Sequence, residues 1–172
     1  MTKLNLNRYQ KFENLLRELK ETSELSIAEV MEERGGRSER YLVFLMGKET
    51  FALPVKQLQE VLLNKLIVPV PGAPPSVHGV VNYMNRIISV TNMHHLFQIP
   101  YEKGENTFLL VTPGIDSESG ILVDALLNLI PVDQKEIKPK ISGQNEFVNR
   151  LTRGEIYCRE RLVTLLDLNG FD

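Results

Sequence analysis

The chain has 172 residues, 42% of them hydrophobic and 24% charged, and its formal net charge is −2. These values are typical of a soluble globular protein, and the lack of a basic excess argues against nucleic acid or an anionic membrane as the partner. No run reaches the ~18 apolar residues of a membrane-spanning helix, and the N-terminus lacks the apolar core of a secretory signal. A lone Cys158 fits a reducing compartment. We therefore expect a cytoplasmic protein without direct membrane insertion.

Residues 1–37 are predicted to form a helical extension. Before Gly35 the chain contains no proline or glycine, and the spacing of its apolar residues predicts two short helices, over about 6–21 and 27–34. The apolar face of the first helix consists of Tyr9, Phe12, Leu15, Leu16 and Leu19. These helices either pack on the core of the chain's own domain or dock into a groove of a partner protein.

Residues 38–172 are predicted to form one mainly β domain. Short runs rich in Val, Ile, Leu, Phe and Thr recur between turn-forming residues, which favours a sandwich or barrels over alternating strands and helices. The predicted strands are Tyr41–Met46, Phe51–Leu53, Leu58–Leu63, Ile67–Val70, Val77–Met84, Ile87–Met93, Thr107–Thr112, Gly120–Leu127, Gly154–Cys158 and Leu162–Leu168. Several are apolar on both faces, so we expect them to be buried twice, between two small barrels that share a core.

The sequence offers no catalytic, cofactor or metal site. The adjacent residues His94 and His95 are expected to point to opposite faces of a strand, and together with His78 they lack the spacing of zinc ligands. Asp116 and Glu118 belong to a polar segment between two strands, which is typical of a solvated turn. Glycine-rich phosphate loops do not occur in the sequence. We therefore do not expect an enzyme.

Four segments, taken in order, resemble the CheW family of chemotaxis coupling proteins. They are YLVFLMGKETFALPVKQLQEVL (41–62), VPVPGAPPSVHGVVNYMNRIISVTNM (68–93), SGILVDALLNLIPV (119–132) and RLTRGEIYCRERLVTLLDL (150–168). They are similar, respectively, to the family's opening hairpin, its proline-rich loop with paired strands, a strand bearing glycine and aspartate, and a closing hairpin. The order and spacing of the four segments carry the resemblance, which covers nearly everything after the predicted helices.

The resemblance implies a fold of two five-stranded, SH3-like β-barrels and a non-enzymatic adaptor without a cofactor. It implies two partners, namely the regulatory domain of a CheA-type histidine kinase and the cytoplasmic tip of chemoreceptors, and hence recruitment to receptor arrays at the membrane. By residue correspondence, the partner-binding surfaces lie near Leu58, Glu60, Met84, Asn85, Leu109, Leu126 and Leu129.

The chain departs from the family at the turn between the central paired strands. Met84 and Asn85 stand where the family has arginine and glycine, and Arg86 follows two places late. Methionine cannot make the charged contacts of arginine, whereas asparagine tolerates a left-handed turn. Asn92 likewise replaces an aspartate of the family. Three alternatives stay open: a paralogue in a separate motility or pilus pathway, a regulator that binds only one of the two partners, and a small-ligand-binding β-barrel.

Overall fold

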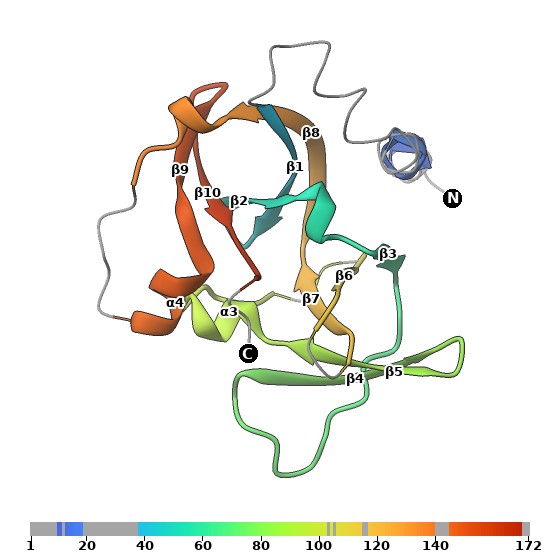
Figure 1. Cartoon of the computed structure of the whole chain (residues 1–172). Helices are drawn as coiled ribbons and strands as arrows, with labels where there is room; N and C mark the ends of the chain where they lie inside the picture. The colour runs from blue at the N-terminus through green and yellow to red at the C-terminus, as the bar shows by residue number, and fades with distance from the viewer. Residues whose placement is uncertain are drawn as a thin grey trace.

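The computed structural model describes residues 10–11, 13–18, 38–102, 104, 106–114, 117–139 and 145–169. The described N-terminal residues within 10–18 are helical, and we call them the N-terminal helix; the second predicted helix, 27–34, lies outside the described residues. The remaining elements, drawn in Figure 1, are β1 (Ser38–Met46), β2 (Glu49–Pro54), η1 (Val55–Gln57), β3 (Glu60–Leu63), β4 (Val77–Tyr83), β5 (Arg86–Thr91), α3 (Met93–Leu96), β6 (Phe108–Thr112), β7 (Ser119–Val123), β8 (Ala125–Asp133), η2 (Gln134–Glu136), α4 (Glu146–Leu151), β9 (Thr152–Cys158) and β10 (Arg161–Leu166). Within those ranges, no helix is long and apolar enough to cross a membrane.

The strands form two five-stranded sheets. The first has the order β8-β1-β2-β10-β9, and the second has the order β3-β6-β7-β5-β4. The pairs β2·β10 and β5·β7 are parallel, and the other described pairs are antiparallel. An isolated bridge joins the two ends of each sheet, between Lys138 and Glu155 in the first and between Val68 and Val80 in the second. Each sheet thus curls into an open barrel held by one bridge, and the prediction of two five-stranded SH3-like barrels is confirmed.

The two barrels repeat one plan. The hairpins β4–β5 and β9–β10 each turn on two residues with positive φ, which are Met84 (49°) and Asn85 (62°) in one and Arg159 (47°) and Glu160 (63°) in the other. Two such residues are the signature of a tight hairpin turn whose twist matches that of its strands. The second strand of each hairpin then pairs in parallel with β7 or β2. The same strand arrangement has therefore been built twice along one chain.

A glycine stands at the equivalent place in both barrels. A Cβ atom added to Gly79 would lie 2.5 Å from the carbonyl oxygen of Val68, and one added to Gly154 would lie 2.5 Å from the carbonyl oxygen of Lys138. Val68 and Lys138 are the residues whose bridges close the barrels. Only glycine allows the backbone to approach this closely, so both barrels depend on it for closure.

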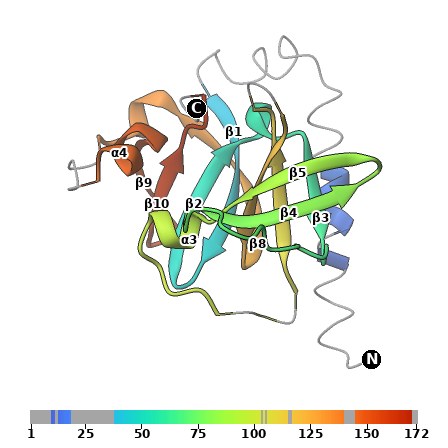
Figure 2. The same cartoon turned by 90° about the horizontal axis from the view of Figure 1, so that it is seen from below.

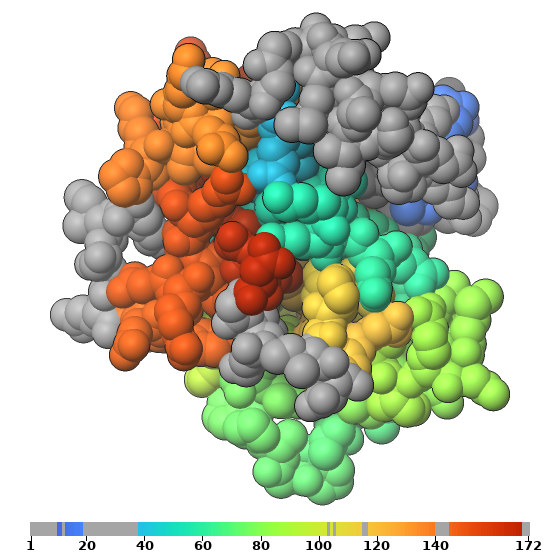
Figure 3. All heavy atoms as spheres, viewed as in Figure 1, coloured from blue at the N-terminus to red at the C-terminus, as the bar shows by residue number. Residues whose placement is uncertain are grey.

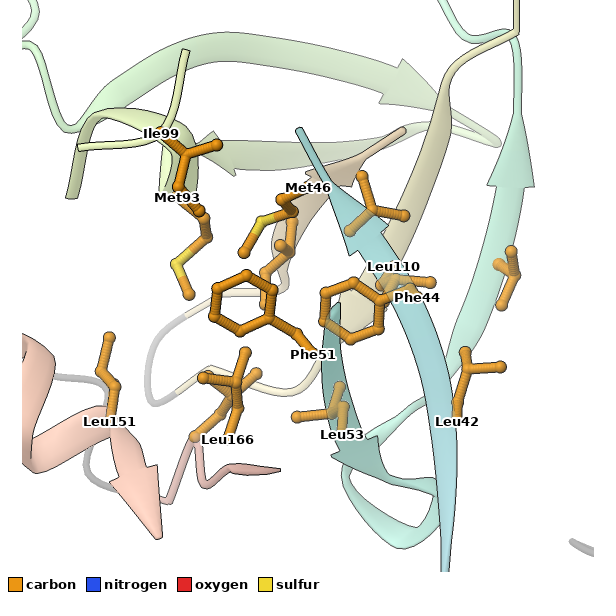
Figure 4. Close-up of a cluster of buried hydrophobic side chains, with 14 of the residues drawn as sticks. Leu42, Phe44, Met46, Phe51, Leu53, Met93, Ile99, Leu110, Leu151 and Leu166 are labelled. Carbon is orange, nitrogen blue, oxygen red and sulfur yellow. The ribbon is translucent and has the colours of Figure 1, made fainter. Parts of the chain in front are cut away.

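Alternate residues of the same strand fill different cores. On β1, Tyr41 and Val43 fill the interior of the first barrel, whereas Leu42 and Phe44 lie in a cluster that both barrels share. The shared core contains Leu42, Phe44, Met46, Phe51 and Leu53 from the first barrel, Val61, Leu110, Ile121 and Val123 from the second, and Met93, Ile99, Leu151 and Leu166 from the connecting segments and β10, as Figure 4 shows for ten of them. The prediction of strands buried on both faces is confirmed.

Two predicted strands differ from the structure. Residues 67–70 do not form a strand: only Val68 forms a bridge, and the adjacent Pro69 has no N–H with which to extend a ladder. The run 120–127 is divided at Asp124 into β7 and β8. The backbone N–H of Asp124 donates to the carbonyl of Leu45 at 2.9 Å. This residue is therefore the crossing point from the second barrel to the first.

The residues after β5 form a short helix instead of continuing the strand. Asn92 caps α3, because its Oδ1 accepts from the backbone N–H of His95 at 3.1 Å while its Nδ2 donates to the carbonyl of Pro75 at 3.2 Å. The expectation that His94 and His95 lie on a strand is wrong, since both lie on α3. An asparagine at position 92 ends the strand and starts the helix.

Candidate docking surfaces

One arginine joins three strands of the second barrel. Arg86, the first residue of β5, donates from Nη2 to Glu60 Oε2 at 2.9 Å and from Nη1 to Glu118 Oε1 at 2.5 Å. Glu60 begins β3 and Glu118 directly precedes β7. The hydrogen bond with Glu60 is the largest cause of a raised pKa of Arg86, and the hydrogen bond and charge of Glu118 raise this pKa further. We call these three side chains the arginine clamp, which ties the β4–β5 hairpin to the body of the barrel.

Met84 and Asn85 form the projecting tip of the hairpin β4–β5 (Figures 1 and 3). Asparagine adopts positive φ readily, but methionine seldom does, so the backbone at Met84 is held in an uncommon conformation. The Met84 side chain is 76% exposed. A large, flexible apolar side chain presented at a rigid turn is suited to contact with another protein.

Exposed apolar side chains occur on β5 next to the clamp and on the segment that follows β3. They are Ile87 on β5 and Leu66, Val68 and Val70 on the segment. Two cations lie close to the ring of Tyr83, with Lys65 Nζ 4.6 Å and the Arg86 guanidinium carbon 5.6 Å from its centroid. We call Met84, Asn85, Ile87 and the clamp the hairpin surface. Exposed apolar side chains with aromatic and arginine groups are typical of protein interfaces.

A second candidate surface lies along the junction of the two barrels. Leu58, which follows η1, and Leu126 and Leu129 on β8 are half-buried and pack against the shared core. A register shift in the β1–β8 pairing between Val43 and Phe44 adds one residue to β8. That bulge brings Leu126 and Leu129, three positions apart, to the same face of the strand. We call Leu58, Leu126 and Leu129 the leucine seam.

Leu109 does not belong to either surface. Its side chain is 2% exposed and fills the interior of the second barrel. It also lies against Gly120, where an added Cβ would meet its side chain at 2.7 Å. The prediction that Leu109 contacts a partner is therefore not carried further. The other predicted positions are divided between the hairpin surface, which holds Glu60, Met84 and Asn85, and the leucine seam.

Two functional candidates were missed by the sequence reasoning. Arg86 was noted only as displaced from the family's arginine, and Glu118 was assigned to a solvated turn. The structure brings a guanidinium to this corner of the barrel despite the methionine at position 84. The available signal was an arginine directly after the hairpin turn and a glutamate two positions before the predicted strand 120–127. The companion residue Asp116 lies outside the described residues.

Apart from the two candidate surfaces, a cluster of titratable side chains lies where the two barrels meet. His94 Nε2 lies 3.2 Å from Asp124 Oδ2, and the same oxygen accepts from the backbone N–H of Gly47 at 2.5 Å. The ring of Tyr101 packs edge-on against His94 and His78, with centroid separations of 4.9 and 5.4 Å. In the described ranges, no three His, Cys, Asp or Glu side chains converge as metal ligands do. The cluster fastens the barrels together.

His78 is expected to make the protein less stable in mild acid. Burial, with a contribution from the charge of His94, lowers the pKa of His78 from its usual 6.5. The unfolded chain therefore binds a proton more readily than the folded one, so the free energy of unfolding decreases as the pH falls below about 6.5 and through the lowered pKa of the folded state. In His78→Gln, the free energy of unfolding, measured by urea titration, should decline less between pH 7.5 and pH 5.5 than in the unmodified protein. Parallel pH profiles would contradict the assignment.

The fold and the two surfaces define a class of protein, namely a module that binds other proteins. Its barrel interiors are filled by apolar side chains, and two of its exposed apolar side chains, Met84 and Ile87, lie on the hairpin surface. The chain belongs to the CheW family, because the model of the CheW-like domain matches residues 40–171. Members of this family are non-enzymatic adaptors of chemotaxis signalling.

Curated relatives and a solved structure agree with this family. The chain is 27% identical over 154 residues to the chemotaxis protein CheW of Helicobacter pylori, covering 89% of this chain and 93% of the relative. It is 25% identical over 128 residues to CheW of Thermotoga maritima, covering 74% and 83%. The fold is similar to that of the scaffolding protein TtCheW from Thermoanaerobacter tengcongensis, with a TM-score of 0.70 at 20% identity over 78% of this chain and 88% of that one.

Proposed function

We propose that the protein is a chemotaxis scaffold that bridges a CheA-type histidine kinase and chemoreceptors in the cytoplasm. The observation that carries the proposal is the presence of two separate candidate surfaces on a CheW-family fold. Two surfaces on one rigid body allow two partners to be held at the same time. A regulator that binds only one partner would need only one of them. The interiors of both barrels are packed with side chains, which argues against a ligand-binding barrel.

The hairpin surface is assigned to the regulatory domain of the kinase. Met84 and Asn85 project from the molecule, and the clamp formed by Arg86 with Glu60 and Glu118 fixes their position. A preorganised apolar tip loses little conformational freedom on binding, which favours affinity. Because the guanidinium of Arg86 is present at this corner, the replacement of the family's arginine by Met84 does not leave the surface without a cation.

The leucine seam is assigned to the receptor tip, which is a helical hairpin in this class of receptor. Leu58, Leu126 and Leu129 form an apolar strip bordered by both barrels. Such a strip fits the apolar face of an amphipathic helix, whose side chains at helical spacing enter between the half-buried leucines. Binding at a junction also gives the receptor contact with both barrels.

The Met84→Glu variant tests the kinase assignment. A carboxylate at the hairpin tip cannot enter an apolar contact without desolvation, so we expect the dissociation constant for the regulatory domain of a CheA-type kinase from the same organism to rise about tenfold. Because Met84 is exposed, the melting temperature should change little. Isothermal titration calorimetry measures the first quantity and circular dichroism the second.

Leu162→Glu is the matched control, since Leu162 is, like Met84, an exposed apolar side chain that receives the same new charge, and it lies on β10 of the other barrel. It should leave kinase binding unchanged. Addition of the full-length protein to kinase and receptors in vesicles should make kinase activity depend on the receptor. Unchanged affinity in Met84→Glu would exclude the hairpin surface, and a failure to bind either partner would exclude the proposed function.

A further inference from the structure

The N-terminal helix packs against the same apolar cluster as the leucine seam. Leu15, although it comes from the N-terminal segment, is only 6% exposed and is a member of the shared core. Leu16 packs against the same cluster, as do Leu58, Leu126 and Leu129. In Figures 1 and 2, which are at right angles to each other, the helix lies beside β3. A helix of the chain itself therefore borders the strip that we assign to a helical partner.

Among the described residues of this helix, Leu15, Leu16 and Glu18 attach it to the domain. Glu18 Oε1 lies 3.1 Å from Nη2 of Arg40 on β1, and Arg40 is in register with Pro131 of β8. Apart from Leu15 and Leu16, the described helix side chains are exposed; they are Gln10, Lys11, Glu13, Asn14, Arg17 and Glu18. A half-exposed ion pair contributes little to stability. Among the described residues of the helix, the apolar part of the attachment therefore comes from two adjacent leucines.

We propose that the N-terminal helix is a resident occupant of the leucine seam, which a partner's amphipathic helix must displace in order to bind. The inference rests on the proposed function, in which the seam receives the helical receptor tip, and it adds regulation of that site. Two helices cannot pack on the same leucines at once. The apparent affinity for the tip is therefore reduced by the fraction of molecules in which the seam is already covered, and any event that withdraws the helix increases coupling.

The test compares two glutamate variants of the full-length protein on the same helix. Leu15→Glu places a charge in the shared core and should release the helix, whereas Asn14→Glu adds the same charge at an exposed position. Burial of one leucine corresponds to about a tenfold change or more in an equilibrium constant. We expect Leu15→Glu to bind a soluble fragment of the receptor tip about tenfold more tightly than the unmodified protein, and Asn14→Glu to bind it with unchanged affinity.

Hydrogen exchange at residues 10–18 is the second measurement. In the unmodified protein these amides should lose protection when the tip fragment is added, and in Leu15→Glu they should be unprotected from the start. Equal tip affinity in all three proteins would overturn the displacement while leaving the proposed function intact. If no form binds the tip but all bind the kinase domain, the receptor assignment of the seam and the displacement both fail. A lower melting temperature of Leu15→Glu without a gain in tip affinity would assign the helix to the core alone.

Discussion

Replacing Gly79 by alanine is expected to lower the free energy of unfolding by about 2–4 kcal/mol. The added methyl group would lie 2.5 Å from the carbonyl oxygen of Val68 and 2.8 Å from the Cγ2 atom of Ile67. The atom nearest to this methyl group belongs to the backbone, which cannot relieve the clash by changing rotamer as a side chain can. The bridge between Val68 and Val80, with N···O distances of 2.8 and 2.9 Å, must then open. The loss combines steric strain with two weakened hydrogen bonds, and chemical denaturation measures it.

Gly154→Ala should behave in the same way, because its methyl group would meet the carbonyl oxygen of Lys138 at 2.5 Å. Gly104→Ala is the control: the nearest atom to its Cβ would be the carbonyl oxygen of Asn106, at an ordinary 3.6 Å. We expect the control to unfold like the unmodified protein. A tolerated alanine at both Gly79 and Gly154 would mean that the bridges do not limit the closure of the barrels.

Reversing the charge of Arg86 is expected to weaken binding to the kinase regulatory domain by tenfold or more. In Arg86→Glu, a carboxylate would face those of Glu60 and Glu118, and repulsion would move the hairpin away from β3 and β7. The tip formed by Met84 and Asn85 would then lose the position in which it meets the partner. Because the ion pairs are partly exposed, their loss should lower the melting temperature only slightly, although the affinity for the kinase domain falls strongly.

The charge-swapped double variant, Glu60→Arg with Arg86→Glu, distinguishes positioning from direct contact. The new arginine can pair with both carboxylates, so the hairpin is tied down again and most of the affinity should return. Glu60→Lys alone should weaken binding, since the lysine would repel Arg86. If the affinity of the double variant is as low as that of the single variants, the kinase domain contacts the charge at position 60 directly, and the position of the hairpin does not determine the affinity.

The pattern of apolar residues predicted a sandwich or barrels with strands buried on both faces, and the resemblance to the CheW family implied two five-stranded barrels. Strands such as β1 and β6 are apolar at successive positions, which is favourable only if both faces are buried. In the structure, alternate residues of these strands do fill different cores. The breaks in the pattern were harder to place. Asp124 ends β7 because it pairs with Gly47 and His94 from other parts of the chain, and such long-range contacts leave no local trace.

The candidate site was predicted in part, for a similar reason. Glu60, Met84 and Asn85 were selected by correspondence with the family, but the partners of Arg86 are distant in sequence and become visible only in the structure. Leu109 and Leu110 differ by one position, and only strand register decides that the first fills the barrel and the second the shared core. The bulge that aligns Leu126 with Leu129 is likewise a property of the pairing.

The order of strands along the chain differs from their order in space, and this has a consequence for biosynthesis. All strands of the second barrel lie between Glu60 and Val123, inside a sequence whose two flanks, β1–β2 and β8–β10, make up the first barrel. A nascent chain emerging from the ribosome can complete the inner barrel while the outer one still lacks three strands. Since domains generally fold as units from the N-terminal side during synthesis, the inner barrel can serve as a template on which the late strands assemble. The faces of β1 and β2 that line the interior of the first barrel stay uncovered until β8 pairs with β1 and β10 pairs with β2.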